Sequence, residues 1–301
     1  MKTIIVLGGS GFFGKLIVER LREAGLQPLV ASRSSGDMRI DANNPDDLRV
    51  YLKQRDLVID AAGPFQTRTP ALIETAMRIG FDIIDLSDSP DYTAMIYERA
   101  APIGAAGIRV LTACSTLSTV SAMVVKLAGI PEPRKLTVVL RPESRYTANR
   151  GAVESFLHSI EEVTPRGMRM KTVDSVTLPR AFSTLQNAEL IVDTGAAGNF
   201  FLQFASFRRL IRRYQSTAAK IARAIGRGEG IVRFEVSTMI RRKEQVFRGR
   251  KSYMLAVLPA VHAATAIAAG RFPHRGIVPP TEHVDSAHLL AAITKEGITI
   301  T

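Results

Sequence analysis

Short apolar runs separated by helical patterns fill the first 125 residues of the chain. The runs predict strands over residues 3–7, 28–32, 38–40, 57–60, 83–86 and 109–113. Between them, apolar residues recur every three or four positions, which predicts helices over residues 14–24, 46–53, 69–79, 92–106 and 118–127. Strands this apolar, alternating with helices, are typical of a parallel sheet that is covered on both faces.

The pattern changes after Pro131-Glu132-Pro133, where polar and apolar residues begin to alternate. This alternation predicts strands over residues 135–141, 168–178, 189–193 and 231–241, interrupted by helices near residues 153–162 and 206–225. A period of two indicates a largely antiparallel sheet with one solvated face. Helical patterns return over residues 253–269 and 286–294, and we expect these helices to pack back on the first domain.

A glycine-rich segment directly follows the first predicted strand and opens the first predicted helix. Its sequence is Gly8-Gly9-Ser10-Gly11-Phe12-Phe13-Gly14, which satisfies G-x-G-x-x-G in the required strand–turn–helix context. Gly9 permits a tight turn, Gly11 lets a pyrophosphate approach the backbone, and Gly14 allows close helix–strand packing. The helix N-terminus presents N–H groups and its positive dipole end to phosphates, so we expect these seven residues to bind a dinucleotide.

The end of the second predicted strand indicates which nicotinamide dinucleotide binds. NAD sites usually have Asp or Glu about 20 residues beyond the glycines, where it bonds the ribose 2′-OH. The corresponding stretch here is Ala31-Ser32-Arg33-Ser34-Ser35, which contains a guanidinium and hydroxyls but no acid. Arg forms bidentate bonds to phosphate, so Ser32, Arg33 and Ser34 favour NADP(H) over NAD(H). A solvated loop is the alternative for Arg33, and Asp41 is a further candidate contact on the adenine side.

Four further segments resemble the saccharopine dehydrogenase-like oxidoreductases. Asp56–Phe65 looks like the family's strand and G-P-F turn, and Gly80–Asp88 resembles its D-L-T/S segment. Thr112–Ser118 occupies the place of its small-residue turn before a helix, and Arg150–Ser155 is similar to its G-T-x-x-S helix start. The likeness extends over about residues 1–130 and is looser beyond them. It implies that Gly63, Pro64 and Phe65, with Ala62 before them, lie beside the cofactor's pyrophosphate and nicotinamide ribose.

The resemblance also implies chemistry on the C–N bonds of amino-acid adducts and a second, mixed domain inserted before the C-terminal helices. Two departures, Asp88 in place of a glycine and Ala152 in place of a threonine, prevent the substrate from being carried over. We therefore predict an α/β protein with an N-terminal Rossmann-type doubly wound parallel sheet over residues 1–130. A second α+β domain of largely antiparallel sheet follows over residues 131–251, and C-terminal helices over residues 252–301.

Candidate substrate-binding residues are less specific. Asp85, Ser87 and Asp88 follow a strand end, where open parallel sheets bind ligands, although Asp85 and Ser87 are equally suited to satisfying a turn or capping a helix. Arg141 and Tyr146 follow the first strand of the second domain, where they suit a carboxylate or phosphate or simple surface pairing.

Cys114 also follows a predicted strand, but we favour an inert buried thiol over a nucleophile. The Y-x-x-x-K signature is absent and the five histidines lack metal-ligand spacing, so we assign neither a catalytic residue nor a metal site.

The positive charge is concentrated in one stretch. The chain has a net charge of +12, and residues 201–251 contain 14 Lys/Arg and 3 Asp/Glu, a local charge of +11. Within it, residues 206–227 form a basic amphipathic pattern that suits an anionic membrane, an acidic ligand or solvent. No nucleic-acid-binding motif accompanies the charge, so no nucleic-acid partner is expected. The longest apolar stretch, residues 253–269, contains Pro259 and His262 and predicts a buried helix rather than a membrane span.

Together these features predict an NADP(H)-dependent oxidoreductase acting on a small, amino-acid-derived or acidic substrate. The alternative is a non-catalytic nucleotide-binding or membrane-associated protein that keeps the fold. A single cysteine excludes an intrachain disulfide and no secretory signal opens the chain, so we expect a cytoplasmic protein. Whether it forms a homodimer stays open.

Overall fold

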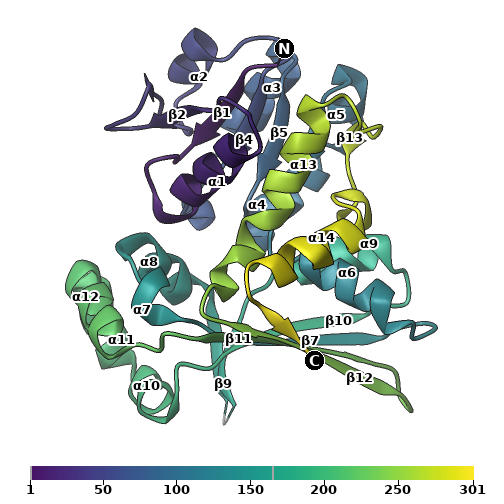
Figure 1. Ribbon diagram of the computed structural model, residues 1–301. Helices are drawn as coiled ribbons and strands as arrows, with labels where there is room; N and C mark the ends of the chain where they lie inside the picture. Colours follow the sequence, from purple (N-terminus) through teal and green to yellow (C-terminus); the bar gives the residue numbers. More distant parts are fainter. Residues whose placement is uncertain (1, 165) are drawn as a thin grey trace. The chain divides into compact units, whose positions relative to one another are not determined.

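The computed structural model describes residues 2–164 and 166–301. Its contacts divide the chain into two compact units, each formed from two stretches of sequence (Figure 1). The first unit contains residues up to Val120 and residues 255–289, and the second contains residues 121–254 and 290–301. The domain boundaries expected from the sequence, after residues 130 and 251, remain predictions.

The first unit is built on a seven-stranded sheet in which every pair is parallel. Its strands, in spatial order, are β13 (Gly276–Ile277), β6 (Arg109–Leu111), β5 (Asp82–Asp85), β4 (Leu57–Asp60), β1 (Ile4–Leu7), β2 (Leu29–Ser32) and β3 (Met38–Arg39). The residues of β1, β4 and β5 are all buried, which explains why these strands are apolar except for aspartates at the ends of β4 and β5. The chain moves outward one way from β1 to β3 and then the other way from β4 to β6. The predicted doubly wound parallel sheet is confirmed.

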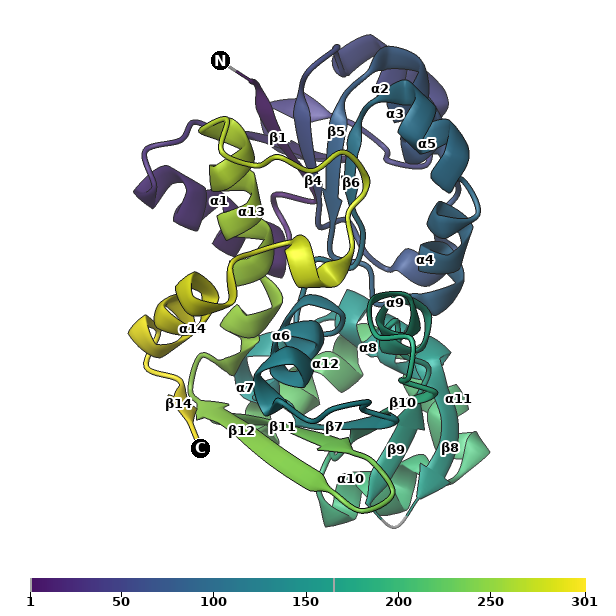
Figure 2. The same ribbon diagram turned by 90° about the vertical axis from the view of Figure 1, so that its right-hand side faces the viewer.

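Helices cover both faces of this sheet. Figure 2 shows α1 (Phe12–Glu23) and α13 (Leu258–Ala268) on one side and α4 (Pro90–Tyr97) and α5 (Ala100–Ala106) on the other. The remaining helical elements assigned wholly to this unit are α2 (Pro45–Tyr51), α3 (Ala71–Ile79) and the 3₁₀ turns η1 (Phe65–Thr67) and η3 (Pro280–Glu282). The single helix expected over residues 92–106 is divided into α4 and α5, with Glu98 as the C-cap of one and Arg99 as the N-cap of the other.

The apolar stretch near residue 260 forms α13, preceded by the 3₁₀ turn η2 (Ser252–Ala256). Seven residues of α13 are buried, and the helix contacts α1, β4 and β5. This burial explains its nearly uniform hydrophobicity. Among the residues that the structure describes, no helix combines the length and the hydrophobicity needed to cross a bilayer.

The second unit is built on another seven-stranded sheet, in which β7 and β10 are parallel and every other pair is antiparallel. Its strands, in spatial order, are β14 (Thr299–Ile300), β12 (Arg242–Gly249), β11 (Gly230–Ser237), β7 (Lys135–Arg141), β10 (Asn187–Val192), β9 (Gly167–Met170) and β8 (Ile160–Thr164). Its helices are α7 (Ser144–Thr147), α8 (Arg150–Ser159), α9 (Asp174–Ala181), α10 (Ala196–Leu202), α11 (Ala205–Arg213) and α12 (Gln215–Ile225). Two helices, α6 (Thr119–Ala128) and α14 (Ser286–Lys295), include residues of both units. The predicted largely antiparallel sheet is confirmed.

Two predictions within the second unit are wrong. The strand expected over residues 168–178 ends at Met170, and α9 begins at Asp174, whose N–H donates to the Thr172 hydroxyl at 3.2 Å. The helix expected over residues 206–225 is interrupted at Tyr214, whose φ of −122° and ψ of 44° are not helical. Strand β12 was missed because its first three residues are charged and exposed, so the apolar alternation of a strand is weak there.

Candidate functional site

The glycine-rich turn after β1 is packed against its own backbone. Gly8 has a φ of +70°, and its carbonyl accepts a hydrogen bond from the Gly11 N–H at 2.8 Å. A Cβ on Gly14 would lie 2.1 Å from that same carbonyl oxygen, so no side chain fits there. Gly11 is the N-cap of α1 and supplies no capping side chain. The first-turn N–H groups of α1 therefore lack a side-chain cap and suit an anion.

This turn lies directly against the turn after β4. A Cβ on Gly8 would lie 2.7 Å from the Ala62 Cα, and the Ala61 N–H donates to the Leu7 carbonyl at 2.9 Å. Strands β1 and β4 are neighbours at the point where the strand order reverses, which is where open α/β sheets bind ligands. The structure thus brings together the two segments from which the sequence predicts cofactor contacts. Gly63 is exposed beside them, and Pro64 follows it through a cis peptide bond.

The residues that favoured NADP(H) form the turn between β2 and β3. The Ser32 hydroxyl accepts a hydrogen bond from the Ser35 N–H at 3.0 Å, which fixes the turn rather than leaving this side chain free. Arg33 and Ser34 are exposed on it. Among residues 2–164 and 166–301, no ion pair or hydrogen bond engages the Arg33 guanidinium. Asp41 is half-buried and accepts from the Asn43 N–H at 2.9 Å, so its carboxylate organises the next turn.

A buried ion pair holds the turn after β4 in place. The Asp60 carboxylate at the end of β4 pairs with Arg68, and their side chains are 0% and 4% exposed. Asp60 also accepts from the Ala62 N–H at 3.0 Å, while the Arg68 guanidinium lies 5.8 Å from the centre of the buried Phe65 ring. Burial lowers the pKa of Arg68, but the Asp60 carboxylate, Tyr92 and Asp85 together outweigh it, so the pKa is raised overall. Arg68 is charged, and the pair fixes both ends of the Ala62–Phe65 segment.

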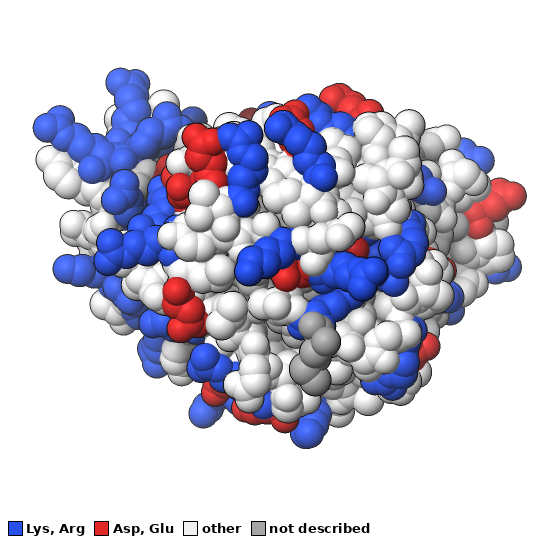
Figure 3. Space-filling view, turned by 90° about the horizontal axis from the view of Figure 1, so that it is seen from above, with Lys and Arg blue, Asp and Glu red and all other residues white. Residues whose placement is uncertain are grey.

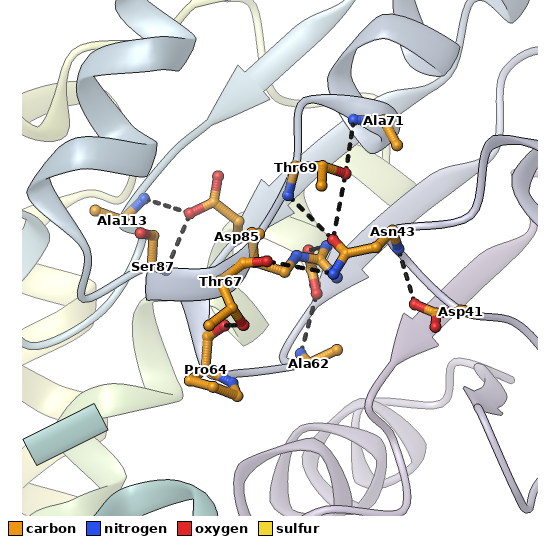
Figure 4. Close-up of polar contacts among 12 residues, drawn as sticks. Asp41, Asn43, Ala62, Pro64, Thr67, Thr69, Ala71, Asp85, Ser87 and Ala113 are labelled. Carbon is orange, nitrogen blue, oxygen red and sulfur yellow. Dashed lines mark hydrogen bonds and ion pairs between the residues drawn. The ribbon is translucent and has the colours of Figure 1, made fainter. Parts of the chain in front are cut away.

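A second brace comes from the loop after β3. The Asn43 amide oxygen accepts from the Thr69 N–H at 3.1 Å, and its amide nitrogen donates to the Thr67 carbonyl at 3.4 Å (Figure 4). The Thr67 hydroxyl donates in turn to the Pro64 carbonyl at 3.2 Å. Sequence reasoning missed Asn43, Asp60 and Arg68 as parts of this site. The one signal in the sequence was an aspartate at the end of an otherwise apolar strand.

Asp85 ties the ends of β5 and β6 together. Its Oδ1 accepts from the N–H groups of Ser87 at 3.0 Å and Ala113 at 2.8 Å, as Figure 4 shows. The residue is fully buried, and its Oδ2 has no hydrogen-bond partner among the described residues. Burial raises the pKa of Asp85 to about 6, although the two N–H groups act in the opposite direction.

This pKa predicts a pH dependence of stability. Because the folded pKa of Asp85 is above its ordinary 3.8, the folded state binds more protons between these values. Protonated Asp85 contributes its full stabilisation below about pH 4, and this contribution is lost as pH rises through about 6. The free energy of unfolding changes by about 3 kcal/mol over this range. In Asp85→Asn the amide oxygen keeps both accepted hydrogen bonds and the titration disappears. The free energy of unfolding, measured with urea, should therefore fall more steeply between about pH 4 and pH 7 in the wild type than in the variant. Parallel curves for the two proteins would contradict this prediction.

The other candidates on this sheet have structural partners. The buried Ser87 hydroxyl accepts from the Ser89 N–H at 3.1 Å, and Ser89 caps α4. Asp88 accepts from the Gln66 side chain at 3.1 Å, which links the turn after β5 to η1. Cys114 is fully buried and burial raises the pKa of its thiol, which agrees with the inert interpretation.

Arg141 and Tyr146 belong to the second unit. Arg141 pairs with Asp193 at 2.6 Å, and this contact contributes to lowering the pKa of Asp193. Tyr146 is 46% exposed, and its ring centre lies 6.5 Å from that of Tyr253. Within the described residues, no group of His, Cys, Asp and Glu has the arrangement of a metal site.

Comparison with known proteins establishes the fold. No protein-family model and no curated protein sequence matches the chain. Among solved structures, the chain is similar to apo saccharopine dehydrogenase (L-Glu forming) from Saccharomyces cerevisiae, with a TM-score of 0.61, 12% identity, and coverage of 100% of this chain and 99% of that one.

Dihydrodipicolinate reductase from Paenisporosarcina sp. shows a weaker similarity, with a TM-score of 0.42 and 11% identity over 92% of this chain and 97% of its own. The WlbA dehydrogenase from Thermus thermophilus, solved with NAD and α-ketoglutarate, has a TM-score of 0.43 and 13% identity over 96% and 94%. The saccharopine dehydrogenase-like fold predicted from the sequence is confirmed, and at these identities the likeness concerns the fold alone.

Proposed function

We propose that the protein is an oxidoreductase that uses NADP(H). The observation that carries the proposal is the turn after β1, where glycines pack backbone on backbone and leave the start of α1 without a side-chain cap. Such a helix start binds the pyrophosphate of a dinucleotide. The exposed Arg33 at the end of β2 is suited to the 2′-phosphate that distinguishes NADP from NAD.

The substrate is a small molecule, amino-acid-derived or acidic. The fold shared with a saccharopine dehydrogenase supports this class, as do the exposed arginines of the second unit. Hydride transfer needs orientation from the protein and a proton source more than a strong nucleophile. This requirement fits a site in which the one cysteine is buried and inert.

Exchange of Arg33 tests the cofactor preference. We expect Arg33→Glu to weaken NADPH binding by about 10- to 100-fold, because a charged hydrogen bond is replaced by repulsion, while NADH binding is kept or improved. Calorimetric titration of both nucleotides measures this. Arg78→Glu, which makes the same charge change at an exposed position of α3, is the matched control and should keep the NADPH preference.

Two outcomes contradict the proposal. Equal NADPH affinity in wild type and Arg33→Glu would show that Arg33 does not bind the 2′-phosphate. NADPH binding without oxidation by any mixture of 2-oxo acid and amine would leave a nucleotide-binding protein and remove the enzymatic assignment.

A further inference from the structure

Four phenylalanines form a cluster on the surface of the second unit. The ring centres of Phe200 and Phe201 are 5.5 Å apart, those of Phe200 and Phe204 are 5.4 Å apart, and those of Phe201 and Phe207 are 5.4 Å apart. Phe200, Phe201 and Phe204 are nevertheless 56%, 49% and 46% exposed. Aromatic residues that meet in this way normally do so inside a core, because each has a large apolar area to remove from water.

The apolar exposure continues along α11 and α12. Phe207, Leu210, Ile211 and Tyr214 have the spacing of one helical face, yet α11 buries none of its residues. Helix α12 packs on α7 and α8 but buries only Ala219, and it leaves Ile221 and Ile225 exposed. An exposed apolar stripe of this length marks a surface that binds another protein, a ligand or a membrane.

The same surface is strongly basic. Residues 196–227, from the start of α10 to just beyond α12, contain seven Lys/Arg and no Asp/Glu. No ion pair engages these seven side chains within the described part of the chain. Arg208 instead donates to the carbonyls of Leu202 at 2.6 Å and Gln203 at 3.1 Å, which joins α10 to α11. Figure 3 shows basic side chains gathered at the left edge of one face of the molecule.

We propose that α10, α11 and α12 form a docking surface for an anionic lipid bilayer, on which α11 and α12 lie flat. Interfacial helices combine apolar side chains that enter the acyl boundary with arginines that reach lipid phosphates and carboxylates. Binding of this surface to a bilayer does not require the cofactor.

Other occupants fit the surface less well. A second copy related by twofold symmetry would bring seven cations against seven cations without an acidic residue to neutralise them. Single-stranded nucleic acid stacks on separately accessible aromatic rings. Here the rings contact one another, and the aliphatic Leu210, Ile221 and Ile225 offer no stacking surface.

Vesicle sedimentation of the full chain tests the proposal. We expect the protein to bind vesicles containing about one third phosphatidylserine at least about tenfold more tightly than vesicles of phosphatidylcholine alone. Arg209→Gln/Arg212→Gln/Arg213→Gln, which spares Arg208, should abolish the difference. Leu210→Gln/Ile225→Gln should weaken binding to the anionic vesicles at unchanged charge. Arg22→Gln/Arg78→Gln/Arg271→Gln removes three exposed charges from the first unit, and this control should bind like the wild type.

Circular dichroism and thermal unfolding of each variant establish that it is folded. Equal binding of wild type and the α11 triple variant would overturn the proposal. So would binding to poly(U) RNA without binding to vesicles. A dimer that Leu210→Gln/Ile225→Gln dissociates, with no vesicle binding by the wild type, would overturn it as well.

Discussion

Arg68→Leu is expected to lower the free energy of unfolding by about 3–5 kcal/mol, because it leaves the fully buried Asp60 carboxylate without its cation. The loss is larger than for a surface ion pair, since water cannot reach the unpaired charge. The turn after β4 should loosen at the same time, and nucleotide affinity should fall with stability. Denaturant unfolding at neutral pH measures the first effect and calorimetric titration the second.

Arg109→Leu is the matched control for this prediction. Arg109 also pairs with a buried aspartate, Asp82, at 3.1 Å. Asp82 keeps Lys2 as a second cation and the Arg109 N–H as a donor at 2.9 Å, so this variant should cost only about 1 kcal/mol. Equal losses of stability in the two variants would show that the Asp60–Arg68 pair stabilises the protein no more than the Asp82–Arg109 pair does.

Gly14→Ala is expected to cost at least about 3 kcal/mol and to abolish dinucleotide binding. The added methyl group would lie 2.1 Å from the Gly8 carbonyl oxygen, and the obstacle is backbone rather than a flexible side chain. Relief requires α1 to move away from β1, which displaces the N–H groups that face the phosphates. Thermal unfolding and NADPH titration of the same sample measure both effects.

Gly104→Ala should instead raise the free energy of unfolding. Gly104 lies inside α5, and a Cβ built on it meets nothing within 4 Å. Alanine at a helix-interior glycine stabilises by about 0.5–1 kcal/mol, and the position is outside the proposed cofactor turn. If both substitutions destabilised the protein equally, the close packing described for the glycine turn would be wrong.

Much of the first unit could be predicted because its signals are local. The buried strands are apolar runs with aspartates only at their ends, and the glycine turn stands between a strand and a helix where only backbone fits. The contact between Gly8 and Ala62 follows from the parallel order of β1 and β4, which the alternation of strands and helices already indicated. The cofactor residues were therefore within reach of sequence reasoning, although their role stays a proposal.

The supporting network could not be predicted, because it depends on partners brought together by the fold. Asn43 reaches Thr69 across 26 residues, and Arg68 meets Asp60 through a loop whose course no periodicity reveals. The end of α11 at Tyr214 was missed for a related reason. The apolar spacing continues through this residue, so the pattern gives no sign of the break.

The central claim is that the backbone at the start of α1 holds the diphosphate of NADP(H). A crystal structure of the protein grown with NADPH tests it most directly. We predict phosphate oxygens within hydrogen-bond distance of the N–H groups of residues 11–13, with the 2′-phosphate on the Arg33 guanidinium. A nucleotide bound elsewhere, or a helix start occupied by protein atoms in the presence of saturating NADPH, would contradict the account.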